Sequence, residues 1–189
     1  MNQKEFFSLE QQLIDGGHDA DLDSFETIRE RLKDKRPLAA DEFARQAIYV
    51  VLAGGFSQKT AKRVHAEIMR RLPASAEELF SVFHNKNKTN AIAKLWDNRQ
   101  TYRDEYYKLS NLDDKLKYIA GLPHIGKITA NHLARNLGEN VFKRDVWIDR
   151  LLLKYGEDLL ERLERETALP RGYIDVVLWK SCQIGLLKF

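Results

Sequence analysis

Residues 112–138 read LDDKLKYIAGLPHIGKITANHLARNLG, and they contain the strongest structural signal in the chain. Apolar residues recur at helical spacing before and after the pentapeptide LPHIG at positions 122–126, which contains the turn formers Pro and Gly. The stretch therefore predicts two helices joined by a tight turn. The first backbone N–H groups of the second helix have no helical partners, and together with the helix dipole they form a site for phosphate.

Side chains around the predicted turn suit the same anionic ligand. Gly126 has no Cβ, so another backbone can approach the turn closely. Lys127 and Arg135 would add cationic contacts, and Thr129 would add a hydroxyl contact. His124 would add a contact from the turn itself, although a surface turn residue without that role is an equal alternative.

The rest of the chain also has a helical pattern. Ser24, Ser57 and Asn111 each stand as an N-cap before a segment of helical periodicity. One long helix is expected over residues 89–108, and no strand alternation or repeat is found. About ten short helices with short connections predict an all-α fold that is not a simple bundle.

The composition is that of an ordinary globular protein, since 43% of the 189 residues are apolar and 31% are charged. The single cysteine, Cys182, excludes an intramolecular disulfide, a zinc ribbon and a four-cysteine iron–sulfur cluster. The N-terminal stretch lacks the apolar run of a signal peptide, and no window approaches 18 uninterrupted apolar residues. We therefore expect an intracellular protein, cytoplasmic or nucleoid-associated, with no membrane partner.

The formal net charge of +3 is unevenly distributed. Residues 1–50 hold 7 Lys and Arg against 11 Asp and Glu, whereas residues 56–150 hold 18 against 11. The middle of the chain is therefore where an anionic partner is expected. Solvated helix faces would give the same charge pattern, so charge alone does not decide between the two interpretations.

A second informative stretch, VFKRDVWIDR, occupies residues 141–150. Asp145 precedes a helix whose apolar positions include Ile148, Leu151 and Leu152, so it occupies the N-cap position. An isolated Asp in this setting most often only caps its helix.

LPHIGKITANHLARNLG followed by VFKRDVWIDRL resembles the helix–hairpin–helix DNA glycosylase superfamily, with its LPGxGxxTA hairpin and following VDxHxxR segment. Upstream, IYVVLAGGFSQKTAKRVHAEI (48–68) resembles that family's early helix–loop–helix, and NKTNAIAKLW (87–96) resembles its SKAENI-type helix start. The resemblance covers about residues 40–156, and with the flanking helices it would cover the whole chain. It implies an all-α, two-lobed fold with the DNA and the base in a cleft between the lobes.

That fold would make residues 1–189 a single unit of two lobes. One lobe would combine the terminal helices, about 1–55 and 157–189. A central lobe, about 56–156, would contain the hairpin 112–138. The implied partner is double-stranded DNA that contains a damaged or modified base, and the protein is expected to act on it as a monomer.

The resemblance also implies an activity, in which a nucleotide is flipped out of the duplex and its N-glycosidic bond is broken. Positive charge builds at C1′ as that bond breaks, and a carboxylate at the position of Asp145 stabilises it and helps to orient water. One such electrostatic contact is worth about 3 kcal/mol, or roughly a hundredfold in rate. Lys143 and Arg144, just before this carboxylate, are expected DNA contacts.

No cofactor is implied as a requirement. The hairpin of some family members holds a cation through backbone carbonyls, and a monovalent or divalent cation could be held here by those of Ala120, Leu122 and Ile125. The five histidines are too scattered along the sequence to indicate a metal site.

In the family's bifunctional members, which also nick the strand, a Lys two residues after the final Gly of the hairpin forms a Schiff base with the sugar. Ile128 holds that position here, so a monofunctional glycosylase is expected. Lys127 is one helical step away, and one step turns a side chain by about 100°. The alternatives are a bifunctional enzyme that uses Lys127 or Lys143, and a non-catalytic DNA-binding module, against which Asp145 counts.

Two further groups of residues are expected near the base. Trp147 stands where many relatives have His, so it would line the base pocket or stack on the extruded base, with helix packing as the alternative. Extrusion also needs a side chain to fill the gap in the duplex. His84, in the loop before the SKAENI-type helix, is the best candidate, and Phe56 or Gln58 is its partner. Ordinary polar loops are the alternative for these three.

The base itself is not specified by the sequence. Alkylated purines, deaminated or mismatched pyrimidines and oxidised guanine are all compatible with the hairpin. Alkylated purine is slightly favoured, because cationic bases leave readily and an aromatic pocket suits them.

Overall fold

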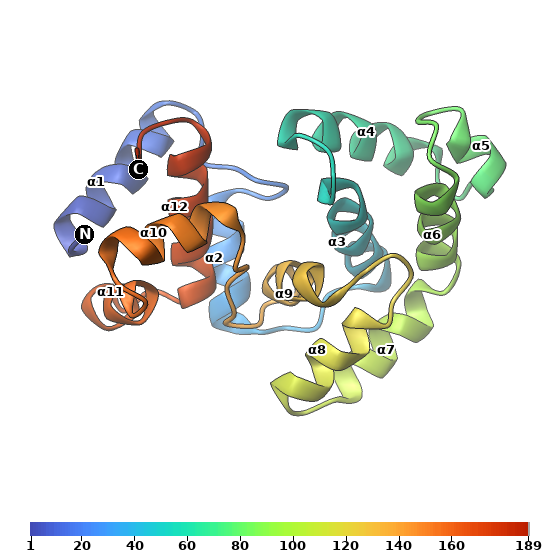
Figure 1. The fold of residues 1–189 in the computed structure, drawn as a ribbon. Helices are drawn as coiled ribbons and strands as arrows, with labels where there is room; N and C mark the ends of the chain where they lie inside the picture. Colours follow the sequence, from blue (N-terminus) through green and yellow to red (C-terminus); the bar gives the residue numbers. More distant parts are fainter. Residues whose placement is uncertain (189) are drawn as a thin grey trace. The chain divides into compact units, whose positions relative to one another are not determined.

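The computed structural model describes residues 1–188, and these residues form twelve helices and no named strand (Figure 1). The all-α prediction is confirmed. No helix in the described part of the chain has both the length and the apolar character needed to cross a membrane. The helices are α1 (Gln3–Asp15), α2 (Phe25–Asp34), α3 (Ala40–Ala53), α4 (Gln58–Arg71), α5 (Ala76–Phe80), α6 (Lys86–Asp97), α7 (Arg99–Lys108), α8 (Leu112–Ala120), α9 (Lys127–Asn136), α10 (Val146–Tyr155), α11 (Leu159–Thr167) and α12 (Arg171–Gln183).

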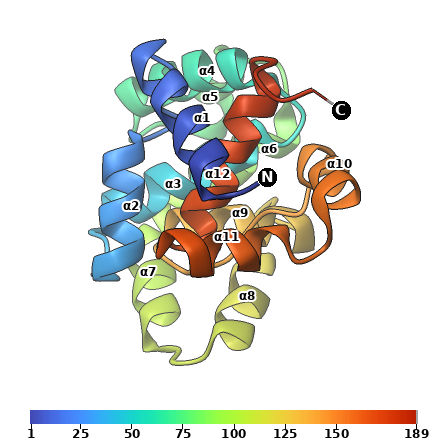
Figure 2. The same ribbon diagram turned by 90° about the vertical axis from the view of Figure 1, so that its left-hand side faces the viewer.

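The chain divides into two compact units. The terminal unit combines Met1–Arg36 with the chain from Gly138 onward, and its first and last helices lie side by side in both views (Figures 1 and 2). Helix α12 is its centre, because α1, α2, α10 and α11 all pack against it. Ten of the thirteen residues of α12 are buried, as expected for a helix surrounded by others.

The central unit comprises Pro37–Leu137. Its central helix is α3, which packs against α4, α6, α7 and α9 and buries nine of its fourteen residues. Helices α8 and α9 pack against each other, and α5 packs against α6. The predicted hairpin therefore forms one side of this unit.

These boundaries differ from the expected lobes, which were about 1–55 with 157–189 and about 56–156. Helix α3 belongs to the central unit because its apolar residues pack against helices of that unit. Helix α10 belongs to the terminal unit because Ile148, Leu151 and Leu152 enter the core cluster around α12. Asp145 is therefore in the terminal unit, whereas the hairpin is in the central unit.

The single helix expected over residues 89–108 is interrupted at Asn98. The side-chain amide of Asn98 donates a hydrogen bond to the carbonyl of Lys94, and its backbone leaves the helical region at φ −101°, ψ 15°. Asn side chains compete with the helical hydrogen bonds in this way. The prediction was wrong here because apolar periodicity continues across the break.

Candidate active site

The hairpin turn between α8 and α9 is anchored by two buried apolar side chains, Leu122 and Ile125. The N–H of Ile125 donates to the carbonyl of Leu122 at 3.0 Å, which closes the turn. Between them, His124 is exposed and has φ +60°. This left-handed conformation favours glycine, so His124 holds it at some cost in free energy.

The start of α9 leaves room for a ligand backbone at Gly126. A Cβ built on Gly126 would have no atom within 4 Å. The N–H groups of Lys127 and Ile128 have no hydrogen-bond partner among residues 1–188. Donors of this kind at a helix N-terminus favour an anion.

Some side chains of α9 are exposed to solvent, and others are buried or hydrogen-bonded within the protein. Lys127 is exposed, and Ile128 is 69% exposed. The Thr129 hydroxyl accepts a hydrogen bond from the N–H of Gly126 at 2.9 Å, so it stabilises the start of the helix. Arg135 is only 6% exposed, so the phosphate contact expected of it is not available.

The carbonyls of Ala120, Leu122 and Ile125 stay a prediction as a cation site. The Leu122 carbonyl already accepts the N–H of Ile125 within the turn. No group of three His, Cys, Asp or Glu side chains in the described residues is arranged to hold a metal ion.

Asp145 caps α10, as predicted. Its Oδ1 accepts hydrogen bonds from the N–H groups of Trp147 at 3.0 Å and Ile148 at 3.3 Å. Its Oδ2 lies 3.2 Å from Nζ of Lys143, and its side chain is 15% exposed. The carboxylate is thus held on both oxygens and remains partly accessible.

The segment that carries Asp145 is tied to the core of the terminal unit. The N–H of Lys143 donates to Oδ2 of Asp175, a residue of α12 that is 1% exposed. Upstream, Asn140 accepts the N–H of Gly172 at 3.1 Å. These bonds fix the backbone just before the carboxylate. No sequence pattern indicates this role of Asp175, because it depends on the packing of α12.

Cys182 lies in the same unit and is buried. Burial, and to a lesser extent the negative charge of Asp145, raises the pKa of the Cys182 thiol to about 12. The thiol is therefore neutral near pH 7 and behaves as a small apolar group.

The three other expected site residues of this unit, Lys143, Arg144 and Trp147, each contact other residues of the same chain. Lys143 pairs with Asp145, and the Arg144 guanidinium pairs with Asp149 at 2.6 Å. Trp147 packs against the core cluster of the unit, and the guanidinium carbon of Arg150 lies 5.6 Å from its ring centroid. Contacts of Lys143 and Arg144 with DNA, and of Trp147 with a base, stay predictions.

The candidates for filling the duplex gap all lie in the central unit. His84 is exposed and meets the ring of Phe80 edge-on, with 5.0 Å between the ring centroids. Phe56 is half-buried, and its ring centroid lies 6.0 Å from that of Phe83. Gln58 is half-buried as the first residue of α4. Of these, His84 is the side chain most available to a ligand.

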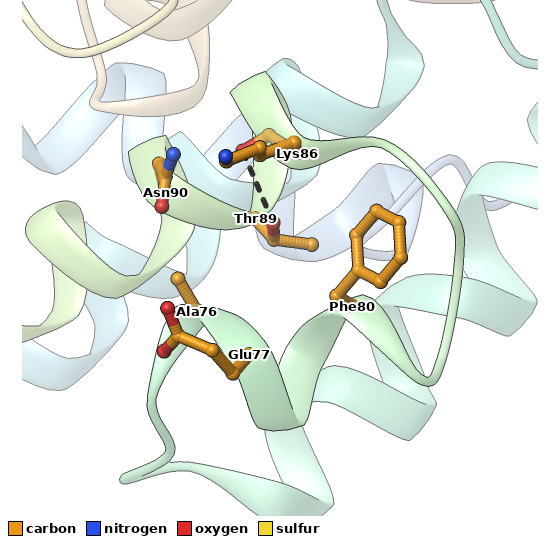
Figure 3. A pocket seen from close by; sticks show the side chains of 6 residues that line it. All are labelled: Ala76, Glu77, Phe80, Lys86, Thr89 and Asn90. Atoms are coloured by element: carbon orange, nitrogen blue, oxygen red, sulfur yellow. Dashed lines mark hydrogen bonds between the residues drawn. The ribbon is translucent and has the colours of Figure 1, made fainter.

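A pocket of about 270 Å³ that the sequence does not indicate lies between α5 and α6 (Figure 3). Figure 3 shows Phe80 and Glu77 of α5 on one side of it, with Lys86 and Asn90 of α6 on the other. The two helices are joined by the segment that carries His84. Nothing in the local pattern indicates this pocket, because it depends on how α5 packs on α6.

Comparison with known proteins identifies the fold of the chain. No protein-family model matches the sequence, and no curated protein matches it. The 8-oxoguanine glycosylase/lyase of Methanocaldococcus jannaschii, solved with DNA that contains 8-oxoguanine, superposes with a TM-score of 0.73 and 18% identity, covering 98% of each chain. The chain has the fold of this glycosylase.

Two further structures agree. Another structure of the Methanocaldococcus jannaschii 8-oxoguanine DNA glycosylase gives a TM-score of 0.71 at 18% identity, covering 96% of this chain and 93% of that one. The 8-oxoguanine DNA glycosylase Tm1821 of Thermotoga maritima gives 0.65 at 17% identity, covering 94% and 93%. The glycosylase fold predicted from the hairpin is therefore confirmed.

Charge is divided unequally between the two units of this glycosylase fold. The central unit, with the hairpin, holds 16 Lys and Arg against 10 Asp and Glu. The terminal unit, with Asp145, holds 15 against 18. A polyanion is therefore attracted to the unit that presents the open N–H groups of α9.

Proposed function

We propose that the protein is a DNA N-glycosylase, which extrudes a damaged or modified base from duplex DNA and hydrolyses its N-glycosidic bond. The observation that carries the proposal is the Asp145 carboxylate, held on both oxygens at the N-terminus of α10 and still partly accessible. A protein that only binds DNA gains nothing from a carboxylate fixed where the DNA is proposed to bind, because that negative charge repels the phosphates. The glycosylase fold supports the same conclusion.

The hairpin serves to hold the DNA backbone in this proposal. The N–H groups of Lys127 and Ile128 donate to a phosphate, and the exposed Lys127 ammonium adds charge. These contacts read phosphate and carry no information about base sequence. Binding is therefore salt-dependent and nearly independent of sequence.

The bond that breaks joins C1′ of the sugar to the base nitrogen. The base leaves with the bonding electrons, and positive charge develops on the sugar. The Asp145 carboxylate stabilises that charge. Water then adds to C1′, and the proton it loses is taken up by the nitrogen of the departing base, so that a neutral base and a C1′ hydroxyl result. Lys143 holds the carboxylate in place, since its ammonium lies 3.2 Å from Oδ2.

Ile128 supports a monofunctional reaction. Its side chain is exposed at the position where the bifunctional members carry the Schiff-base lysine, and it has no amine to attack the sugar. A second candidate function, a glycosylase/lyase that uses Lys143, is favoured by the contact between Lys143 and Asp145. Lys127 as the lyase residue has no such contact to support it.

Oxidised guanine is the substrate class to expect first, because the superposed glycosylases act on or bind 8-oxoguanine. Purified protein is expected to release 8-oxoguanine from a duplex oligonucleotide and to leave an abasic site that breaks only after alkali. Parallel duplexes with an alkylated purine or a deaminated pyrimidine test the other classes. Tight binding without release of any base would instead support the non-catalytic module.

Borohydride reduction during turnover separates the monofunctional from the bifunctional reaction. A Schiff base becomes a stable protein–DNA adduct on reduction, so the monofunctional protein yields none. An adduct that is lost in Lys143→Met and kept in Lys127→Met would assign a lyase step to Lys143.

Lys127→Gln is expected to weaken binding to all duplex sequences alike and to lower the slope of log K against log salt by about one. The reason is the loss of one phosphate contact with its released counterion. Fluorescence anisotropy of a labelled duplex across a salt series measures the slope. Lys33→Gln is the control, because Lys33 is an exposed lysine of the terminal unit. An unchanged slope in Lys127→Gln would place that side chain away from the DNA.

A further inference from the structure

Lys88 is a buried cation in the central unit. It is the third residue of α6, it is 6% exposed, and burial lowers the pKa of its ammonium. Its Nζ donates a hydrogen bond to the carbonyl of Gly54 and lies 4.7 Å from the ring centroid of Phe56. No carboxylate within residues 1–188 forms an ion pair with it.

Stability alone does not favour a lysine at this position. A cation in the first turn of a helix faces the positive end of the helix dipole, and a buried charge costs free energy unless it is well paired. The compensation comes from α3, because Gly54 is the C-cap of that helix and its carbonyl lies at the negative end. Lys88 thus connects the end of α3 to the start of α6.

The connection joins the two loops that carry the gap-filling candidates. The first loop, residues 54–57, contains Phe56, and the second loop, residues 81–85, contains His84. The Phe56 ring contacts Phe83 of the second loop, and the Asn85 side chain accepts the backbone N–H of Lys88 at 3.1 Å. The two loops are therefore packed against each other, and Lys88 contacts both of them.

We propose that Lys88 is a positioning residue for base extrusion, which holds both loops in the arrangement that lets His84 enter the duplex as the base leaves. Phe56 helps to hold this arrangement and does not itself enter the DNA, because its ring already packs against Lys88 and Phe83. The inference rests on the proposed glycosylase function, and it assigns Lys88 to the extrusion step rather than to bond cleavage.

The experiment compares Lys88→Met with Lys86→Met. Met keeps most of the volume of Lys88 and removes the ammonium, whereas Lys86 is exposed and lies two residues earlier in the same turn. Extrusion is followed by the fluorescence of 2-aminopurine placed beside an 8-oxoguanine in a duplex, in an Asp145→Asn background that blocks cleavage. Affinity for an undamaged duplex is measured in parallel.

Lys88→Met is expected to reduce the fluorescence increase by about tenfold and, in protein that retains Asp145, to slow single-turnover excision by about tenfold, because misplacing a group that acts on the substrate costs that much or more in rate. Affinity for undamaged duplex should stay within about twofold, and Lys86→Met should change neither extrusion nor excision by more than that. Lys88→Gln keeps an N–H donor for Gly54 and should recover part of the loss, and it replaces Lys88→Met if that variant does not fold.

Three outcomes overturn the inference. Normal extrusion in folded Lys88→Met, or in Lys88→Gln where it replaces an unfolded Lys88→Met, would show that the arrangement of the loops does not depend on the Lys88 ammonium. An equal loss of extrusion and of undamaged-duplex binding would indicate a general structural role. Slow excision with normal extrusion would place Lys88 in the chemical step. Failure of the proposed function is distinct, because the wild-type protein would then show neither extrusion nor excision on any lesion tested.

Discussion

Asp145→Asn is expected to slow base excision by at least about a hundredfold, while affinity for damaged DNA is kept or improved. The Asn side chain retains an oxygen that can accept the N–H groups of Trp147 and Ile148, so the cap of α10 survives. The substitution removes the negative charge that the developing cation on the sugar needs. Single-turnover excision and equilibrium binding on the same duplex measure the two effects.

Asp149→Asn is the matched control for this prediction. Asp149 lies on the same helix, is exposed, and pairs with Arg144 rather than capping the helix. Its substitution should leave the excision rate within about twofold, since exposed ion pairs contribute little. If Asp145→Asn folds, binds and still excises at a rate near that of the wild type, Asp145 is only a helix cap.

Ile128→Lys is expected to add a strand-nicking activity to the monofunctional glycosylase proposed above. The new amine would stand at the hairpin position that the sequence resemblance assigns to a Schiff-base lysine, on a side chain that is already exposed. The N-terminus of α9 disfavours the charged ammonium, so more of the amine is free to attack C1′. The imine formed then allows β-elimination of the 3′ phosphate, and borohydride converts it into a covalent adduct visible on a denaturing gel.

The control for this gain is Ile128→Met, which changes the side chain without adding an amine and should yield no adduct. Stability should be almost unaffected in both variants, because the position is exposed and Lys and Met are good helix formers. If Ile128→Lys excises bases but forms no adduct, the start of α9 lies out of reach of the sugar.

Much of the fold could be predicted because its signals are local. Ser24, Ser57, Asn111 and Asp145 each cap a helix, as the sequence indicated, since an N-cap is read from one residue and the segment after it. Features that depend on a few neighbouring residues could therefore be predicted from the sequence.

What could not be predicted depends on contacts between distant segments. The side of the boundary on which α3 lies is decided by its packing against α4, α6, α7 and α9. The burial of Lys88 depends on Gly54, 34 residues away in sequence, and nothing within α6 signals it. Lys143 and Arg144 were predicted as DNA contacts from their charge, whereas their acidic partners became visible only in three dimensions.

The interrupted sequence of the terminal unit has a consequence for synthesis on the ribosome. The central unit is one continuous segment that is complete once Leu137 has emerged, whereas the terminal unit must wait for α12, its central helix. We therefore expect a nascent chain to form the hairpin, the proposed contact for the DNA backbone, before the core that holds Asp145 exists. We expect translation intermediates that can grip nucleic acid but have no competent carboxylate, so catalytic capacity would appear last.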